Sequence, residues 1–355
     1  MASTYLSRTV STSTDNTKFT ISVWVKKAKQ VSSDYQCIIN SRQISSTAGL
    51  GLFFGNNDNL FFIFGTSASA SADVKSNSVY RDNSAWYHIV ATGDASQTGT
   101  DKLKFWVNGE QITSFATDNR SSFATIEYDL GDATYPTIIG RKYNGTYQIE
   151  GSMAHFHFID GTAYDADTFG ETDSTTGIWK PKTAPSVTYG TNGFFLKFEN
   201  SGAFGTDSSG NGNTFTVNGT MTQTIDTPSN VFATKNLLDV NPSNTNTFAN
   251  GNTTITTNGN GARSTLGAST GKYYAEVKYV NQTSFCGIMD LSTAISSTSA
   301  FIKLFGSNNG EIFVNGSSTD TNVGAGTAIA DNSIIMFAMD LDNNRLYIGK
   351  NGLWW

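Results

Sequence analysis

The stretch FTISVWVKK, residues Phe19–Lys27, decides the fold class of the chain. Its residues alternate between two sets, the apolar Phe19, Ile21, Val23 and Val25 and the opposite set Thr20, Ser22, Trp24 and Lys26. Successive side chains of a β-strand point to opposite faces of a sheet. This two-residue period therefore predicts a strand with one apolar face against a hydrophobic core.

The same pattern continues along the chain in short stretches separated by turn residues. Further predicted strands are LGLFFG (50–55), LFFIFG (60–65), KLKFWV (102–107) and GSMAHFHFIDG (151–161). The dipeptide Asn108-Gly109 follows KLKFWV and favours a type I′ turn, so we predict a tight hairpin there. The turn density leaves little room for helices, apart from one short helical turn expected at 165–169.

The composition agrees with an all-β protein and excludes several other classes. Only 15% of the 355 residues are charged, and Gly contributes 34 residues, so coiled coils and helix bundles are disfavoured. The 23 Lys and Arg against 29 Asp and Glu give a net charge of −6, which argues against a nucleic-acid partner. No apolar run reaches the roughly 18 residues that span a bilayer, so no membrane insertion is expected.

The length favours two domains, and the composition indicates where they meet. Residues 204–219 are rich in Gly, Ser and Asn, and residues 220–244 carry few periodic apolar positions. We therefore predict a first domain over 1–225, a linker over 226–236 and a second domain over 237–355.

Four stretches of the first half occur in a characteristic order: a Trp strand, a Trp-Tyr-His strand, a Val-Asn-Gly hairpin and an Ile-Gly-Arg segment before the last strand. They are FTISVWVKK (19–27), SAWYHIVAT (84–92), KLKFWVNGEQI (102–112) and IIGRKYNGTYQIEGSMAHFHFIDG (138–161). In this order they resemble the laminin-G-like branch of the concanavalin-A-like lectin/glucanase superfamily. The resemblance implies an antiparallel jelly-roll β-sandwich.

The rest of this half consists of FIDG (158–161), FGETDSTTGIWKPK (169–182), YGTNGFFLKFENSG (189–202) and DSSGNGNTFTVNG (207–219). Together these stretches are similar to a tail found on structural proteins of tailed bacteriophages. In laminin-G-like domains DSSGNGN usually precedes the first strand, whereas here it follows the last one. Either the first domain is circularly permuted, or this segment closes the domain as a late strand.

GKYYAEVKY (271–279) and IIMFAMDLDNNRLYIGKNG (334–352) alternate as strands and resemble the SPRY domain, with its KxYxEV strand and late hairpin. The two resemblances together imply two tandem antiparallel concanavalin-A-like (jelly-roll) β-sandwiches. In SPRY-like sequences further strands follow this hairpin, whereas only Leu353, Trp354 and Trp355 follow it here. We expect the natural protein to continue past Trp355, or another chain to supply the missing strands.

The superfamily includes glucanases, which need two carboxylates about 5 Å apart, often as Glu-x-Asp-x-x-Glu on one strand. The nearest approximation here is Glu127-Tyr-Asp129-Leu-Gly-Asp132. Its last acid is one carbon shorter than Glu, and the stretch is rich in turn residues. A solvated loop is the simpler interpretation, and we predict that the protein is not an enzyme.

Two histidines suggest one candidate metal site. His155 and His157 fall on the same face of a predicted strand. A metal site needs a third and a fourth ligand, and the chain has only one other histidine, His88. The alternative is a polar strand face opposite the core.

An oxygen-rich turn is the other candidate metal site. Asp207, Asn211 and Asn213 cluster in DSSGNGN, and laminin-G-like domains often carry a calcium ion at their rim. The same stretch is also ordinary turn chemistry, which needs no ion. Calcium is the only cofactor that the sequence suggests.

Four residues on predicted loops are suitable for binding carbohydrate: Tyr143, Asn144, Tyr147 and Trp179. Aromatic rings stack on sugar C–H groups, and amide and hydroxyl groups bond sugar hydroxyls. The alternative is that Tyr143 and Tyr147 simply cap the sandwich.

The phage resemblance implies a virion surface protein that binds a host-surface glycan, as a tail fibre or receptor-binding adhesin. Its partners would be other virion proteins and a host glycan or receptor, and homo-oligomers would add avidity to weak sites. The alternative is a capsid decoration or head-fibre protein with a purely structural role. The two lone cysteines, Cys37 and Cys286, agree with assembly in a reducing host cytoplasm and release of the virion by lysis.

Overall fold

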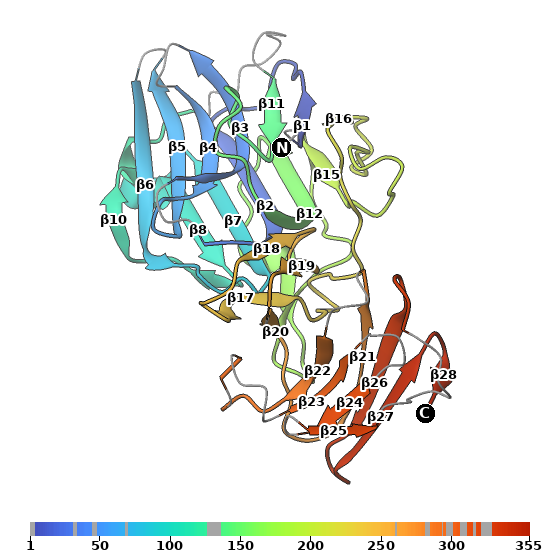
Figure 1. Cartoon of the computed structure of the whole chain (residues 1–355). Helices are drawn as coiled ribbons and strands as arrows, with labels where there is room; N and C mark the ends of the chain where they lie inside the picture. The colour runs from blue at the N-terminus through green and yellow to red at the C-terminus, as the bar shows by residue number, and fades with distance from the viewer. Residues whose placement is uncertain are drawn as a thin grey trace. The chain divides into compact units, whose positions relative to one another are not determined.

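The computed structural model describes residues 4–30, 34–44, 48–67, 70–125, 136–259, 261–280, 285–292, 294–295, 301–305, 311–314, 317–320 and 329–355. Two compact units divide the chain: Met1–Thr234 with Ala249–Thr253, and Lys235–Phe248 with Thr254–Trp355. The regular structure of the described residues consists of strands and three short 3-10 helices, η1 (Gly99–Lys102), η2 (Arg120–Ser122) and η3 (Ala166–Thr168) (Figure 1). No helix in this part of the chain combines the length and the apolar character that crossing a membrane requires.

The first unit contains two large antiparallel sheets and a hairpin (Figure 1). The eight-stranded sheet has the order β10 (Phe115–Asp118), β6 (Ala70–Val79), β5 (Asn59–Ser67), β4 (Ala48–Phe54), β3 (Gln36–Ile44), β11 (Thr137–Ile139), β1 (Tyr5–Arg8), β16 (Thr216–Asn218). The six-stranded sheet has the order β15 (Phe194–Leu196), β12 (Gly151–Asp160), β2 (Lys18–Lys27), β7 (Tyr87–Asp94), β8 (Leu103–Val107), β9 (Glu110–Gln111). The hairpin pairs β13 (Gly170–Thr172) with β14 (Trp179–Pro181).

The hydrophobic core of the first unit joins side chains from both large sheets. Phe19 of β2 stacks on Phe62 of β5, with ring centroids 5.8 Å apart, and meets Phe123 edge-on at 5.7 Å. The other members of this core include Ile21, Val23, Val25, Leu52, Phe54, Phe64, Ile89, Ala91, Leu103, Phe105 and Phe156. Two sheets that share one core form a β-sandwich, so the predicted all-β antiparallel fold is confirmed.

The predicted hairpins are present where the turn residues place them. Asn108 and Gly109 both have positive φ, 51° and 84°, as a type I′ turn requires, and Val107 pairs with Glu110 across it. β4 and β5 pair from Phe54 with Leu60 onward, around the predicted polar turn. The local sequence is therefore sufficient to explain these two connections.

The position of DSSGNGN is explained by the strand that follows it. β16 pairs with β1 through Leu6 and Val217, and it forms an edge of the eight-stranded sheet. The segment thus leads into a late strand that closes this sheet beside its first strand.

The second unit is also built of antiparallel strands. One four-stranded sheet has the order β21 (Lys272–Lys278), β26 (Ile334–Asp340), β27 (Arg345–Lys350), β28 (Leu353–Trp354), and the other β22 (Phe285–Met289), β23 (Phe301–Phe305), β24 (Glu311–Val314), β25 (Ser317–Asp320). Two strand pairs complete it, β17 (Lys235–Val240) with β20 (Ala262–Ser264) and β18 (Asn246–Ala249) with β19 (Thr254–Thr257). Its small core comprises Tyr279, Ile329, Ile335, Phe337 and Ile348, with Cys286 and Ile288 packed against them.

The second face of β2 is buried as completely as the face in the core. Thr20, Ser22, Trp24 and Lys26 are at most 4% exposed. η3 and β14 help to cover this outer face of the six-stranded sheet, where Ala166 and Trp179 pack with Val90 of β7 and Trp106 of β8. The non-core face predicted from the alternation therefore carries a second layer of packing.

His88 lies at the centre of this buried outer layer. Trp179 Nε1 donates a hydrogen bond to His88 Nδ1 at 2.9 Å, and His88 Nε2 lies 2.8 Å from Ser22 Oγ. An indole nitrogen can only donate, so Nδ1 carries no proton and Nε2–H donates to the Ser22 hydroxyl. Burial, with a smaller effect of His155, lowers the pKa of His88 from 6.5 to about 3, so the ring is neutral.

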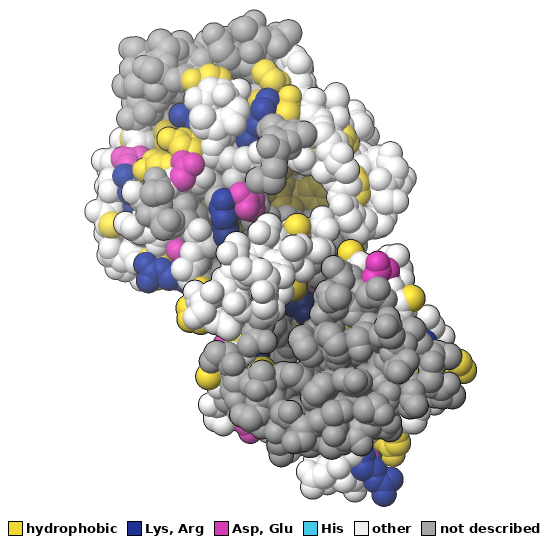
Figure 2. Space-filling view, in the orientation of Figure 1, with side chains coloured by type: hydrophobic (Ala, Val, Ile, Leu, Met, Phe, Trp, Pro, Cys, Tyr) yellow, Lys and Arg dark blue, Asp and Glu magenta, His cyan; other side chains and the backbone are white. Residues whose placement is uncertain are grey.

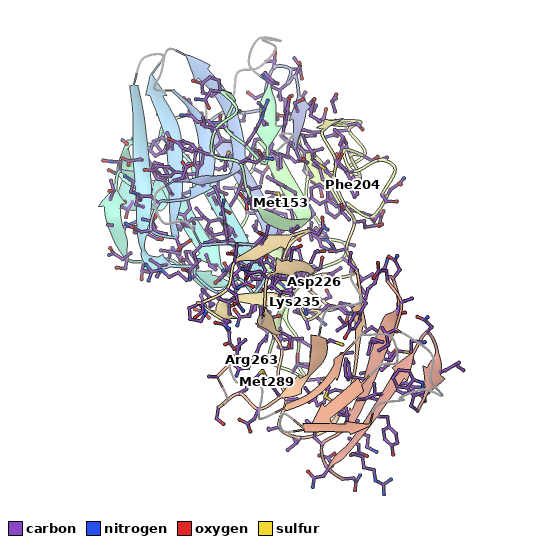
Figure 3. The ribbon with its side chains drawn as sticks, in the orientation of Figure 1. Met153, Phe204, Asp226, Lys235, Arg263 and Met289 are labelled. Carbon is purple, nitrogen blue, oxygen red and sulfur yellow. The ribbon has the colours of Figure 1, made fainter. Side chains whose placement is uncertain are left out.

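The last two residues of β2 are lysines, and each forms a buried ion pair with the carboxylate of an aspartate. On the outer face, Lys26 Nζ donates to Asp226 Oδ2 at 2.8 Å, and Trp86 Nε1 donates to Asp226 Oδ1 at 3.4 Å. Asp226 is labelled in Figure 3. Lys27 Nζ donates to Asp58, and burial lowers the pKa of Lys27. Removing an ion from water costs several kcal/mol, so either partner alone would be strongly unfavourable here.

The surface of the described residues carries few charges. In the view of Figure 2 it is mostly white, the colour of backbone and of side chains that are neither hydrophobic nor charged. This matches the low charged content of the sequence.

The buried histidines predict that the first unit loses stability in mild acid. His88 and His157 are both buried with lowered pKa values, whereas in the unfolded chain each accepts a proton near pH 6.5. Below that pH the unfolded state binds more protons, so the free energy of unfolding falls as the pH falls. Between pH 7.5 and 5.5 we expect each ring to contribute a loss of roughly 1–2 kcal/mol.

The measurement is urea unfolding of the full chain at both pH values, followed by tryptophan fluorescence. His88→Gln keeps an acceptor for Trp179 and a donor for Ser22 but cannot titrate, so it should remove about half of the pH-dependent loss. His155→Gln is the comparison variant, because its half-buried ring also has a lowered pKa and should account for a smaller share of the loss than the fully buried His88. An unchanged pH dependence in His88→Gln would show that the neutral buried imidazole is not its source.

Candidate functional site

A cluster of aromatic rings covers part of the outer face of the eight-stranded sheet. Leu52, Phe54, Leu60 and Phe62 point into the core, so Phe53 of β4 and Phe61 of β5 point outward. Tyr35 packs on both of these rings, with centroids 6.5 and 5.4 Å away, and Tyr147 lies 5.0 Å from Tyr35. The strands thus provide a rigid base, and the two tyrosines form its half-buried upper layer.

Tyr147 reaches this cluster because of an unusual backbone conformation. Its φ is 57°, a left-handed value that is costly for a residue with a Cβ, and its carbonyl accepts a hydrogen bond from Cys37 N–H at 2.8 Å. The preceding turn is closed by Lys142 N–H on the Thr146 carbonyl at 2.9 Å. Strain of this kind persists only where surrounding contacts hold it, and it is often found at functional sites.

Tyr143 and Asn144 lie in the same turn and are more accessible. Tyr143 is half-buried, and its backbone N–H donates to Asn40 Oδ1 at 3.1 Å. Asn144 is exposed, and its Oδ1 accepts a hydrogen bond from Thr146 Oγ1 at 2.7 Å. With the described residues, the hydroxyl groups of Tyr35, Tyr143 and Tyr147 form no hydrogen bond.

Lys142 adds a positive charge to these rings. Its Nζ lies 5.4 Å from the ring centroid of Tyr147 and 5.7 Å from that of Tyr143. Both distances are within the range of a cation–π contact. We call Tyr35, Tyr143, Tyr147 and Lys142 the tyrosine surface, which is the candidate functional site.

The structure places the three loop residues predicted from the sequence in one turn and Trp179 elsewhere. Trp179 lies in β14, where its indole bonds His88 in the outer layer of the six-stranded sheet. A Cβ on Gly109 or on Gly170 would come within 3 Å of its ring, so the indole fits closely between two glycines. This packing accounts for Trp179 without a ligand.

The three residues predicted as calcium ligands form a turn held by hydrogen bonds. Asp207 Oδ1 accepts bonds from the backbone of Phe195 and Ser209 at 2.9 Å each, and Asp207 Oδ2 accepts from Asn213 N–H at 2.7 Å. The amide nitrogen of Asn211 donates to the Gly193 carbonyl at 2.9 Å. These bonds occupy most of the acceptor capacity of Asp207 and explain the residue types of the stretch.

The side chain of Asn213 is also held by hydrogen bonds within the protein. Its amide nitrogen donates to the carbonyls of Thr191 and Gly193 at 2.9 and 2.8 Å, and its Oδ1 accepts from Arg8 of β1. The turn therefore fastens the late part of the first unit to its first strand. In the described residues no group of three His, Cys, Asp or Glu side chains is arranged to hold a metal ion.

The two histidines of β12 are separated by a β-bulge. The register with β2 shifts between Ala154 and His157, and His155 takes a φ of 46°. His157 is buried, its Nδ1 lies 2.9 Å from Tyr189 Oη, and its ring stacks on Phe195 at 3.9 Å. Burial lowers the pKa of both histidines. His157 is thus held by packing and one hydrogen bond to a tyrosine.

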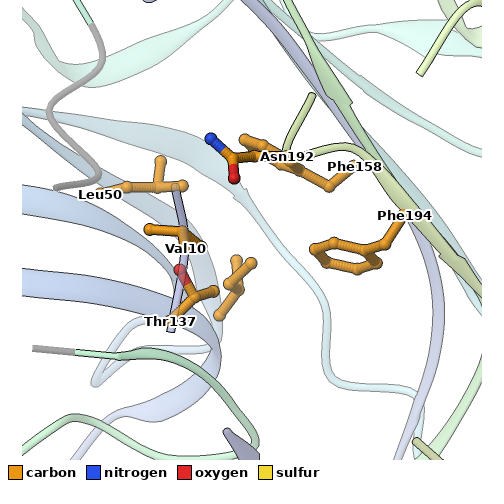
Figure 4. A pocket seen from close by; sticks show the side chains of 7 residues that line it. Val10, Leu50, Thr137, Phe158, Asn192 and Phe194 are labelled. Atoms are coloured by element: carbon orange, nitrogen blue, oxygen red, sulfur yellow. The ribbon is translucent and has the colours of Figure 1, made fainter. Parts of the chain in front are cut away.

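The acidic stretch with Glu127, Asp129 and Asp132 lies outside the described residues. The interior of the first unit offers a gap of about 10 Å³ between the sheets, lined by Val10, Leu50, Thr137, Phe158, Asn192 and others (Figure 4). A gap of this size holds one water molecule at most. This gap is therefore too small to hold a sugar.

Sequence reasoning did not find Tyr35, Phe53, Phe61 or Lys142. β4 and β5 carry apolar residues on both faces, because Phe53 and Phe61 occupy positions where the alternation would place polar residues. Apolar residues on both faces indicate that the outer face is covered as well, and this was the signal in the sequence. Tyr35 precedes β3, and only the fold brings it beside Tyr147.

A family model described as the concanavalin A-like lectin/glucanases superfamily matches residues 2–167. No curated protein matches the chain. The structure is similar to a candidate carbohydrate-binding protein from Bacteroides ovatus, with 17% identity, 64% of this chain and 62% of that chain covered, and a TM-score of 0.43. The chain thus spans less than two thirds of that protein.

Two further solved structures are similar in part. The SAP-like pentraxin of Limulus polyphemus has 12% identity over 46% of this chain and 72% of that one, with a TM-score of 0.32. The CBM40 of the Ruminococcus gnavus IT-sialidase, bound to α2,3-sialyllactose, has 14% identity over 43% of this chain and 86% of that one, with a TM-score of 0.30. The antiparallel sandwich agrees with the family match, so residues 2–167 are similar to domains of the concanavalin A-like lectin/glucanases superfamily.

Proposed function

We propose that the first unit binds carbohydrate through the tyrosine surface. The observation that supports this most directly is the group of half-buried rings whose hydroxyls bond none of the described residues, held on a rigid sheet. Tyrosine rings offer an apolar face to sugar C–H groups and a polar edge to sugar hydroxyls. The superfamily match of residues 2–167 agrees with this proposal.

The rigidity of the surface favours binding. Tyr147 and Tyr35 are packed on Phe53 and Phe61, so little side-chain freedom remains to be lost when a ligand docks. A single shallow site of this kind binds weakly, and repetition of the chain on a particle would raise the avidity. The proposal thus concerns a surface lectin with modest affinity per copy.

We propose further that the chain is a virion surface protein of a tailed bacteriophage, acting in host adhesion. Support comes from the sequence alone: residues 158–219 resemble a phage structural-protein tail, and 271–279 with 334–352 resemble a SPRY domain, a second recognition module. Its partners would be other virion proteins and a host glycan, and its place would be the virion. The alternative is capsid decoration with a structural role.

Binding of glycans by the full chain should depend on Tyr143. Tyr143→Ala removes a ring that contacts Lys142 but lies outside the aromatic base, so the fold should be retained. Loss of one stacking ring should weaken binding on a glycan array or to host polysaccharide about tenfold, which corresponds to about 1.4 kcal/mol. Tyr147→Ala should weaken binding as well, at some cost in stability.

The matched control is Tyr274→Ala, which removes an exposed tyrosine of the second unit. It should leave the affinity unchanged while circular dichroism shows all variants folded. Equal binding by wild type and Tyr143→Ala would exclude the tyrosine surface as the site.

Cryo-EM of particles that carry the chain separates adhesion from decoration. We expect density for the two units at the tail, where contact with the host is made. Density on the capsid lattice would contradict the adhesin and favour the structural alternative.

We also propose that the protein does not hydrolyse glycans. The motif around Glu127 lacks the third Glu that a retaining glucanase requires. Incubation of the full chain with β-glucans should therefore release no reducing sugar. Release that is lost in Glu127→Gln would contradict this expectation and assign an active site there.

A further inference from the structure

We infer that the glycan bound at the tyrosine surface is acidic, with a carboxylate or sulfate group received by the ammonium of Lys142. This inference rests on the proposed function and adds the charge of the ligand to it. The observation that carries it is the position of Lys142 between two tyrosine rings, with no acidic partner among the described residues.

Several other lysines of the first unit are paired with carboxylates. Lys26 and Lys27 are buried with Asp226 and Asp58, and on the surface Lys29 bonds Glu150. Lys75 lies 4.8 Å from the ring centroid of Phe61 at the same aromatic base, but its Nζ is 3.0 Å from Asp73 Oδ2. The positive charge of Lys142 has no such compensation in the described residues.

The setting of Lys142 strengthens its attraction for an anion. The chain carries a net charge of −6, so an anionic polymer would be repelled by most of the molecule and attracted only at local positive sites. The rings beside the ammonium exclude part of its water, and a half-buried charge binds an anion more strongly than an exposed one.

The charge lies close to the base of the site. Cys37 packs with Phe53 and Phe61 in the base, and the ammonium of Lys142 opposes the rise that burial causes in the pKa of its thiol. Cys37 also donates its backbone N–H to the Tyr147 carbonyl and thereby restrains the main chain of Tyr147. A sugar ring on the tyrosines would place an acidic substituent within reach of Lys142.

One acidic side chain near the site works against the inference. Asp34 precedes Tyr35, is exposed, and accepts the Tyr35 N–H through its Oδ1 at 2.9 Å. This bond directs the carboxylate to the backbone on the Tyr35 side, whereas the cation–π contacts of Lys142 are with Tyr143 and Tyr147. The turn that carries Lys142 also carries Arg141, whose guanidinium stacks on Tyr5 at 3.5 Å.

The test is binding of the full chain to a glycan array on which neutral glycans are printed beside their sialylated, uronic-acid and sulfated forms. We expect acidic members to bind about tenfold more tightly than their neutral partners, and added NaCl to reduce this preference. Separate carboxylate and sulfate members show which anion is preferred.

Three variants identify Lys142 as the source of the preference. Lys142→Gln should abolish the preference by weakening the binding of acidic glycans more than that of their neutral partners. Lys142→Arg should retain the preference, and Lys75→Gln, at the paired lysine, should leave it unchanged. Equal binding of acidic and neutral forms, or an intact preference in Lys142→Gln, would overturn the inference. If Tyr143→Ala still lowers neutral binding in that case, the proposed function stands without it; if no glycan binds, both are overturned.

Discussion

Burial of both faces of β2 is the constraint on which the first unit depends. One face of this strand completes the core between the sheets, and the other carries Ser22, Trp24 and Lys26 in a second packed layer. Polar groups in such a place must find partners, because an unpaired buried donor or charge costs more than a hydrogen bond returns. His88 and Asp226 supply those partners.

This second layer determines where function can be located. Trp179 of the β13–β14 hairpin donates a hydrogen bond to His88, and its ring packs closely against Gly109 and Gly170. Among the described residues, no equivalent hairpin covers Phe53 and Phe61 on the outer face of the eight-stranded sheet, and there Tyr35 and Tyr147 pack on these rings. The two outer faces of one sandwich thus differ: a hairpin packs on one, and half-buried tyrosines lie on the other.

Much of the fold could be predicted from the sequence because its information is local. Alternation locates strands such as β2 and β12, and Asn108-Gly109 specifies its turn through backbone conformation alone. The outer layer could not be predicted, since Ser22 and His88 look like ordinary polar residues until their partners are known. The bulge before His157 also left no clear mark in the alternation.

The candidate site was predictable in part for the same reason. The turn with Tyr143, Asn144 and Tyr147 is visible in the sequence, whereas Tyr35 and the aromatic base join it only through sheet pairing. Asp207 illustrates the converse case, because a turn rich in oxygen ligands can be fully explained by its own hydrogen bonds.

In the first unit, the first strand, β1, pairs with the last strand, β16, and this has a consequence for synthesis on the ribosome. β1 needs β16, and Lys26 needs Asp226, a partner 200 residues later. At about 5–20 residues per second, the early strands wait roughly 10–40 s before these contacts can form. During that interval the lysines at the end of β2 remain hydrated, and their charge opposes premature association of its apolar face. The nascent chain therefore carries its own protection against aggregation until the late segment arrives.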